Sequence, residues 1–88
     1  MYNIQVSDKL KNILSKLSKK DKALYDQVFK KINDIMSSDD IEHYKNLRHN
    51  MNNSKRVHIG HFVLVFQYNE ENNEILFDDF DHHDNIYQ

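Results

Sequence analysis

Along residues 2–36 the spacing of the hydrophobic positions changes from period two to the helical period of about 3.6. Apolar side chains occupy every second position of residues 2–6, which predicts a short, half-buried strand. Over residues 10–17 and 24–36 they recur at intervals of three and four, as on one face of a helix. Ser7 and Asp21 precede these two segments and can cap them. Since few residues separate the segments, we expect an antiparallel helical hairpin after the strand.

The pattern changes again in the second half of the chain. Residues 57–66 are rich in β-branched and aromatic side chains, and a second such run, at residues 75–77, continues into an acidic segment. The Asn and Glu side chains of residues 69–73 are typical of a turn. Gly60 and His61 are expected to form a tight turn or a bulge between two strands.

The predicted element order is β-α-α-β-β-β, with residues 41–47 as a helical turn and residues 48–54 as a polar loop. A helical hairpin needs a surface against which to bury its apolar face, and a sheet can provide it. We therefore predict an α+β fold in which the hairpin packs on a small, curved, mostly antiparallel sheet. A chain of 88 residues suits one domain, and we assign residues 1–88 to it.

Composition narrows the possible classes of protein. Cysteine is absent, so the chain can form neither a disulfide nor a thiolate metal site. No apolar stretch approaches the roughly 20 residues of a membrane span. The first residues lack the basic-then-apolar pattern of a signal peptide. We therefore expect a cytoplasmic protein.

The net charge of −2 conceals a strong asymmetry. Residues 1–56 hold all twelve Lys and Arg and seven acids, a balance of +5. Residues 57–88 hold the other seven acids and no Lys or Arg, a balance of −7. A basic half suits RNA or an acidic partner, although lysine-rich helices also have charged faces simply because water surrounds them.

Candidate chemistry gathers in the strand-rich part, which holds His58, His61, His82 and His83. Strand alternation places Arg56 and His58 on one face, with Val57 and Ile59 on the opposite, core-facing side. If the last strand lies beside the strand of His58, His83 and Tyr87 come near it across the sheet. That arrangement would assemble acid and base groups on an open face.

Three interpretations of this cluster remain open. In metal-free RNA cleavage, one histidine takes the proton of the 2′-OH and another protonates the leaving 5′-oxygen, while Arg56 or Lys55 stabilises charge on the phosphate and Tyr87 contacts a base. In a metal site, the Asp and His of residues 79–84 would be ligands. Neighbouring strand residues point to opposite faces and no HExxH-like spacing is present, so we predict no metal. In the third interpretation these are ordinary surface residues and Tyr87 is a core aromatic.

The same residues resemble the RelE/ParE toxin superfamily. Its C-terminal half has a basic strand, a short turn, an aromatic and aliphatic strand, an acidic hairpin and an ending similar to H-R-x-x-I/V-Y. Here the corresponding segments are Lys55-Arg56-Val57-His58-Ile59-Gly60-His61-Phe62, Val63-Leu64-Val65-Phe66 and His82-His83-Asp84-Asn85-Ile86-Tyr87. The N-terminal strand and hairpin also match in length, so the resemblance covers essentially the whole chain.

The chain departs from RelE-type members at Val63 and His83, where the family usually has arginine. It resembles instead a branch similar to YafQ, which uses histidines and an aromatic residue near the C-terminus. The site residues that this branch implies are His58, His83 and Tyr87, with Arg56 and, in place of a carboxylate, His61. Lys55 and Arg48 are further candidates for contact with RNA.

The resemblance implies a toxin of a type II toxin–antitoxin system. Such a toxin is an endoribonuclease that cleaves mRNA on the ribosome, needs no cofactor, and is neutralised by a RelB-like antitoxin in a hetero-oligomer. The alternative is a non-nuclease or degenerate member of the same fold, either a gyrase poison of ParE type or a module that only binds antitoxin. The histidines argue against the ParE type, because its members lack the RNase residues.

Overall fold

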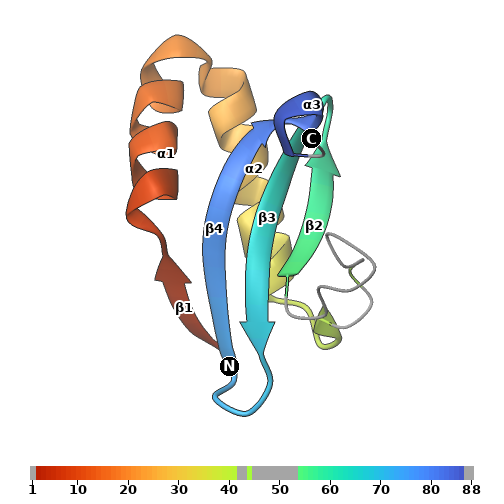
Figure 1. Ribbon diagram of the computed structural model, residues 1–88. Coiled ribbons are helices and arrows are strands. Elements are labelled where there is room, and N and C mark those ends of the chain that lie inside the picture. The colour runs from red at the N-terminus through yellow and green to blue at the C-terminus, as the bar shows by residue number, and fades with distance from the viewer. Residues whose placement is uncertain (1, 42–43, 45–53, 87–88) are drawn as a thin grey trace.

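The computed structural model describes residues 2–41, 44 and 54–86 of the chain (Figure 1). Its elements are β1 (Asn3–Val6), α1 (Asp8–Lys20), α2 (Lys22–Met36), β2 (Ser54–Ile59), β3 (Phe62–Asn69), β4 (Glu74–His82) and α3 (His83–Ile86). The predicted α+β fold and the order β-α-α-β-β-β are confirmed, and one short helix, α3, follows the last strand. The helical turn and the loop predicted for residues 41–47 and 48–54 fall almost wholly outside the described residues.

Side-chain caps define the helical hairpin. The Ser7 hydroxyl accepts a hydrogen bond from the Leu10 N–H at 3.0 Å, and the Asp21 carboxylate accepts one from the Leu24 N–H at 3.1 Å. The Asp21 N–H also donates to the Leu17 carbonyl, so one residue ends α1 and begins α2. In the part of the chain that the structure describes, neither these helices nor α3 is long and apolar enough to cross a membrane.

The four strands form one sheet in the order β1-β4-β3-β2. The hairpins β2–β3 and β3–β4 are antiparallel, whereas β1 pairs with β4 in parallel. The last strand therefore lies beside β3 and β1, so the condition considered in the sequence analysis, a last strand beside the strand of His58, is not met (Figure 1). The reason is that each short turn pairs a strand with its successor, which places β3 between β2 and β4.

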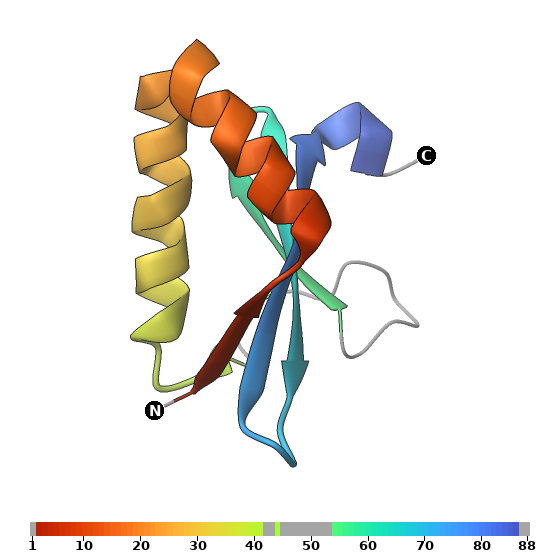
Figure 2. The ribbon, with the colours of Figure 1, turned by 90° about the vertical axis from the view of Figure 1, so that its left-hand side faces the viewer.

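The two faces of the sheet differ in what covers them. Figure 2 shows α2 on one side of the sheet and α3 on the other. The helix-side core joins residues of α1, α2 and the sheet, among them Leu10, Val28, Ile35, Phe66 and Phe77. We call the opposite side the outer face. It carries Arg56 and His58 of β2, Val63 and Val65 of β3, and Asp79 and Asp81 of β4.

Candidate functional site

Arg56 and His58 form a pair on the outer face of β2. Ile59 is 6% exposed and joins the core, while His58 is exposed, so the predicted alternation holds on this strand. Arg56 Nη1 lies 2.9 Å from His58 Nε2. A guanidinium can only donate, so Nε2 must accept, and the neutral His58 ring carries its proton on Nδ1.

His83 stacks on His58. The ring centroids are 5.6 Å apart and the planes differ by 25°. The sequence suggested that His83 lies on a strand, but it is the first residue of α3. Its N–H donates to the carbonyl of His61 at 2.8 Å, which ties α3 to the β2–β3 turn. The two histidines lie close together at the ends of two hairpins and not, as the sequence analysis considered, across paired strands.

His61 and His82 form a second, separate pair. Their ring centroids are 6.3 Å apart with an interplanar angle of 21°. The His82 ring also meets Phe62 edge-on at 5.5 Å, and Phe62 stacks on Phe80. The His61 side chain therefore contributes to this aromatic group, and its carbonyl is the part that reaches His83.

Asp84 connects the two histidine pairs. From the sequence alone it was a candidate only for a metal ligand. Its carboxylate lies 3.7 Å from Nδ1 of both His82 and His83. The backbone N–H of Asp84 donates to His82 Nδ1 at 3.2 Å, so that nitrogen accepts and carries no proton for the carboxylate. The carboxylate is left to interact with His83. Its position directly after two histidines is the feature of the sequence that could have indicated this contact with His83.

Asp81 holds the start of α3 in place. Its Oδ1 accepts hydrogen bonds from the His82 N–H at 2.7 Å and from the Asn85 side chain at 3.1 Å. The bond from Asn85 ties α3 back to the end of β4, and the bond from His82 fixes the Asp81 carboxylate at that end. Asp81 therefore orients the segment that carries His83, which strand periodicity alone did not indicate.

The floor beneath the histidines is apolar. Val63 pairs with His58 in the sheet register and is fully buried, and Val65, two residues further, is 4% exposed. Val63 occupies the position at which the resemblance leads one to expect arginine. A buried apolar floor excludes water on one side, which strengthens electrostatic interactions between the groups above it.

Lys55 does not belong to this exposed set. It is 2% exposed, lies on the core side of β2 with Val57 and Ile59, and its Nζ is 3.5 Å from the Tyr44 carbonyl. Lys55 is therefore buried apart from Arg56 and His58, and its contact with RNA stays a prediction. Arg48 and Tyr87, the other predicted site residues, lie outside the described residues. Within residues 2–41, 44 and 54–86, no three His, Asp or Glu side chains are grouped so as to hold a metal ion.

Two relatives match the chain over nearly its whole length. A protein of Methanocaldococcus jannaschii named "Putative toxin RelE4" is 51% identical over 89 residues, which cover 100% of this chain and 93% of the relative. An uncharacterized protein of Methanosarcina mazei is 41% identical over 88 residues, which cover 99% of this chain and 100% of the relative. No family model matches the chain, and no solved structure matches it. Identity at this level over the full length, on the element order that the sequence predicts, shows that the chain belongs to the RelE toxin superfamily.

Proposed function

We propose that this protein is the toxin of a toxin–antitoxin pair and that it cleaves mRNA on the ribosome as an endoribonuclease. The observation that carries the proposal is the stacked pair His58–His83 with Arg56 Nη1 at 2.9 Å from His58. Two acid/base groups and one permanent cation thereby share one exposed edge of the outer face. The name of the relative from M. jannaschii supports the toxin part of the proposal.

The proposed reaction is an internal phosphoryl transfer. The 2′-oxygen of the RNA attacks the adjacent phosphorus, and the bond from phosphorus to the 5′-oxygen of the next nucleotide breaks. One side chain accepts the proton of the 2′-OH, and another donates a proton to the leaving 5′-oxygen. The products are a 2′,3′-cyclic phosphate and a 5′-hydroxyl, and the chain's own side chains move both protons.

The hydrogen bonds support an assignment of these roles. His58 is the proposed base, because its Nε2 accepts from Arg56 and therefore carries no proton of its own. When the phosphate binds, Arg56 would turn from His58 to the phosphoryl oxygens, where a guanidinium binds strongly. His83 is the proposed acid, and the Asp84 carboxylate lies 3.7 Å from its Nδ1.

The stacking restricts where the phosphate can bind. Rings 5.6 Å apart and within 25° of parallel leave no room for a phosphate between their faces. The phosphate would therefore lie along the ring edges, where one nitrogen of each ring can face one oxygen. In this proposal Tyr87 contacts a base next to the scissile bond, and Arg48 contacts the RNA backbone.

A second candidate function is a non-nuclease toxin or a module that only binds antitoxin. One observation favours it: the outer face has Val63 at the expected arginine position and the carboxylates of Asp79 and Asp81 nearby. These features lower the positive charge that an RNA phosphate needs. The experiment that tests for mRNA cleavage must therefore also detect a toxin that does not cleave RNA.

Brief expression without antitoxin, followed by primer extension on cellular mRNA, separates the two candidates. Wild-type protein should arrest growth and produce ribosome-dependent cuts, and His83→Ala and Tyr87→Phe should abolish both. His82→Ala is the matched control, because it removes the histidine ring next to His83 in the chain and outside the stacked pair. Full toxicity in both site variants would contradict this site. Intact mRNA with inhibited DNA supercoiling would indicate a gyrase poison instead.

We also propose that the partner is an acidic antitoxin that binds the basic part of the chain. α1 presents Lys16, Lys19 and Lys20 to solvent, and all three are exposed. An antitoxin segment rich in Asp and Glu would bind this helix surface with favourable long-range electrostatics. The complex would be a hetero-oligomer of toxin and antitoxin.

A further inference from the structure

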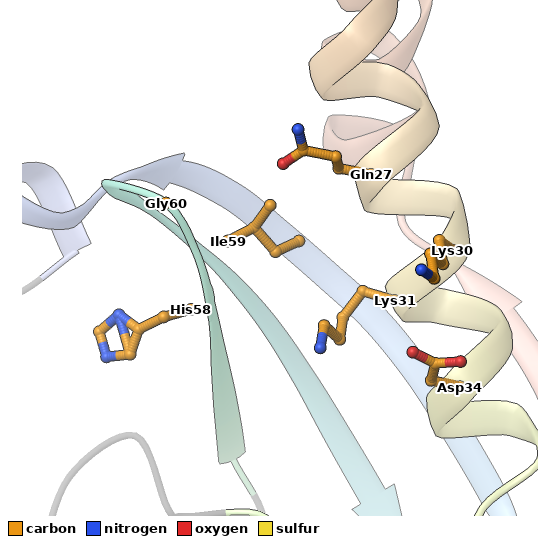
Figure 3. A pocket seen from close by; sticks show the side chains of 7 residues that line it. All are labelled: Gln27, Lys30, Lys31, Asp34, His58, Ile59 and Gly60. Carbon is orange, nitrogen blue, oxygen red and sulfur yellow. The ribbon is translucent and has the colours of Figure 1, made fainter.

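A polar groove lies between α2 and the end of β2 (Figure 3). Its volume is about 340 Å³. Four side chains of α2 line one wall, Gln27, Lys30, Lys31 and Asp34, and the end of β2 with its turn forms the other. We call this the α2–β2 groove, and His58, one of the two stacked histidines, is among its lining residues.

The groove and the candidate site share the end of β2. His58 lines the groove, yet its imidazole points away from α2, whereas Gln27 and Lys31 extend from α2 toward β2 (Figure 3). Gly60 forms the rim between the two sides. It adopts φ +62°, and no atom lies within 4 Å of the position that a Cβ would occupy. The rim is therefore open, and a chain bound at His58 can pass over it into the groove.

The charges of the groove suit a phosphate. Lys30 is exposed and Lys31 is half-buried, and among the described residues the structure records no ion pair for either ammonium. Lysine binds phosphate as a point charge, and the Gln27 amide adds a hydrogen-bond donor. The Asp34 carboxylate opposes one of the two charges, which leaves the α2 wall with a balance of +1.

We infer that the α2–β2 groove binds a backbone phosphate of the RNA strand, beside the scissile phosphate at His58. This inference rests on the proposed function, because it assigns the groove to the same substrate. Lys31 supplies the main contact, since it reaches toward β2, and Lys30 supplies the second charge. The groove then fixes the position of the strand on the toxin, a role that carries no base specificity.

The position of the groove favours RNA over a segment of a protein partner. The shared residue His58 lies at the proposed scissile phosphate, so a strand bound there continues beside the groove, whereas an antitoxin segment has no need to end there.

The test measures RNA binding separately from cleavage. A fluorescent RNA oligonucleotide with 2′-O-methyl groups at every position has no nucleophilic 2′-OH and stays intact, so anisotropy reports binding by the full chain alone. Lys31→Met should weaken binding about threefold to tenfold at low salt and lower the slope of log K against log salt by about 0.7. Asp34→Asn should strengthen binding about twofold to fivefold.

Two control variants make the same charge changes outside the groove. Lys16→Met on α1 and Asp39→Asn after α2 alter exposed residues that do not line it, and both should leave affinity nearly unchanged. Lys30→Met is a second groove variant, in case Lys31→Met folds poorly by circular dichroism. It should lower the salt slope in the same direction.

Several results would overturn the groove assignment. One is an equal effect of Lys31→Met and Lys16→Met on RNA affinity, and another is wild-type binding that does not depend on salt. A third is a loss of affinity for poly-L-glutamate in Lys31→Met as large as its loss for RNA, which would indicate an acidic protein ligand. The proposed function fails by a different result, namely no cleavage of unmodified mRNA by the wild type. Because the modified RNA cannot be cut in any case, the two failures are distinguishable.

Discussion

The imidazole of His58 on β2 stacks on that of His83, the first residue of α3, at 5.6 Å, although β2 does not pair with β4, the strand that precedes α3. β3 lies between the two strands. The chain turns back over the end of β3, because β4 ends at His82 and α3 begins at the next residue. The hydrogen bond from the His83 N–H to the His61 carbonyl then fixes the approach. The pair therefore depends on the ends of both hairpins.

The two histidines should act as a unit in catalysis. His58→Ala and His83→Ala should each lower the rate of mRNA cleavage about 10²–10⁴-fold, the usual contribution of one acid/base group. The double variant should lose no more than about tenfold beyond the worse single variant, because each group needs the other. Single-turnover cleavage of mRNA in a ribosome complex measures this. His82→Ala is the control, and a double-variant loss equal to the product of the single losses would contradict the paired roles.

Arg56 should contribute through both charge and geometry. Arg56→Ala should lower the cleavage rate about 10²–10³-fold, as expected for loss of a preorganised donor to the phosphate. Arg56→Lys keeps the charge but loses the planar fork, so it should recover only part of that rate. The same single-turnover assay applies. Equal rates for wild type and Arg56→Ala would remove Arg56 from the proposed site.

Gly60 should be required by the conformation of its turn. Its φ of +62° costs a residue with a Cβ about 1–2 kcal/mol, although open space surrounds the position. Gly60→Ala should therefore lower the free energy of unfolding by about that amount in a urea titration. Gly60→Asn should cost less, because Asn tolerates this region. If both substitutions cost the same, side-chain packing rather than backbone conformation would be the cause.

Local periodicity predicted the elements well because it reports how each segment meets a core. Ser7 and Asp21 cap the helices that the hydrophobic spacing indicates. Periodicity does not report which strands pair, so the parallel pairing of β1 with β4 could not be predicted from it. The end of β4 could not be predicted either, because residues 81–84 are all polar and show no change of period where the strand becomes α3.

Strand alternation indicates that Lys55 is buried, but its positive charge was given more weight in the sequence analysis. Strand alternation places Lys55 on the same face as Val57 and Ile59, the face assigned to the core. Its positive charge suggested RNA instead. The structure follows the alternation, with Nζ at the Tyr44 carbonyl. In contrast, Arg56 and His58 could be paired correctly from the sequence, because the same rule applies to them.

The ion pair between Lys9 and Asp79 should stabilise the fold modestly. Lys9 Nζ lies 2.9 Å from the carboxylate and joins α1 to β4, but the lysine side chain is 67% exposed. A double-mutant cycle with Lys9→Met and Asp79→Asn should give a coupling of about 0.5–1 kcal/mol, as for exposed pairs. Lys11→Met is the matched control. A coupling of zero would mean that solvent screens the pair completely.

The contribution of this pair should vanish at high pH. The hydrogen bond with Asp79 raises the pKa of Lys9 above its ordinary value of 10.5 in the folded state. The stabilisation is then fully present below the unfolded pKa and is lost as pH rises through the folded one. Urea unfolding at pH 7 and at strongly alkaline pH should therefore show the difference between wild type and Lys9→Met only at pH 7. A difference of the same size at both values would indicate a packing effect of the lysine stem.

Reversing the charge of α1 should weaken binding of the acidic antitoxin proposed above. Lys16→Glu, Lys19→Glu and Lys20→Glu together should lower affinity about tenfold to 100-fold at low ionic strength, mostly through slower association. Surface plasmon resonance at several salt concentrations measures this, and the loss should shrink as salt rises because exposed charges are screened.

Reversal of Lys30 and Lys31 in the α2–β2 groove is the control for the change in net charge. It should weaken RNA binding but leave antitoxin affinity within about threefold, since charges beyond about one Debye length act weakly. Unchanged affinity of the α1 variant at low salt would exclude α1 as the docking surface. A loss that does not depend on salt would mean that the lysine stems pack against the antitoxin, because apolar contacts are not screened by ions.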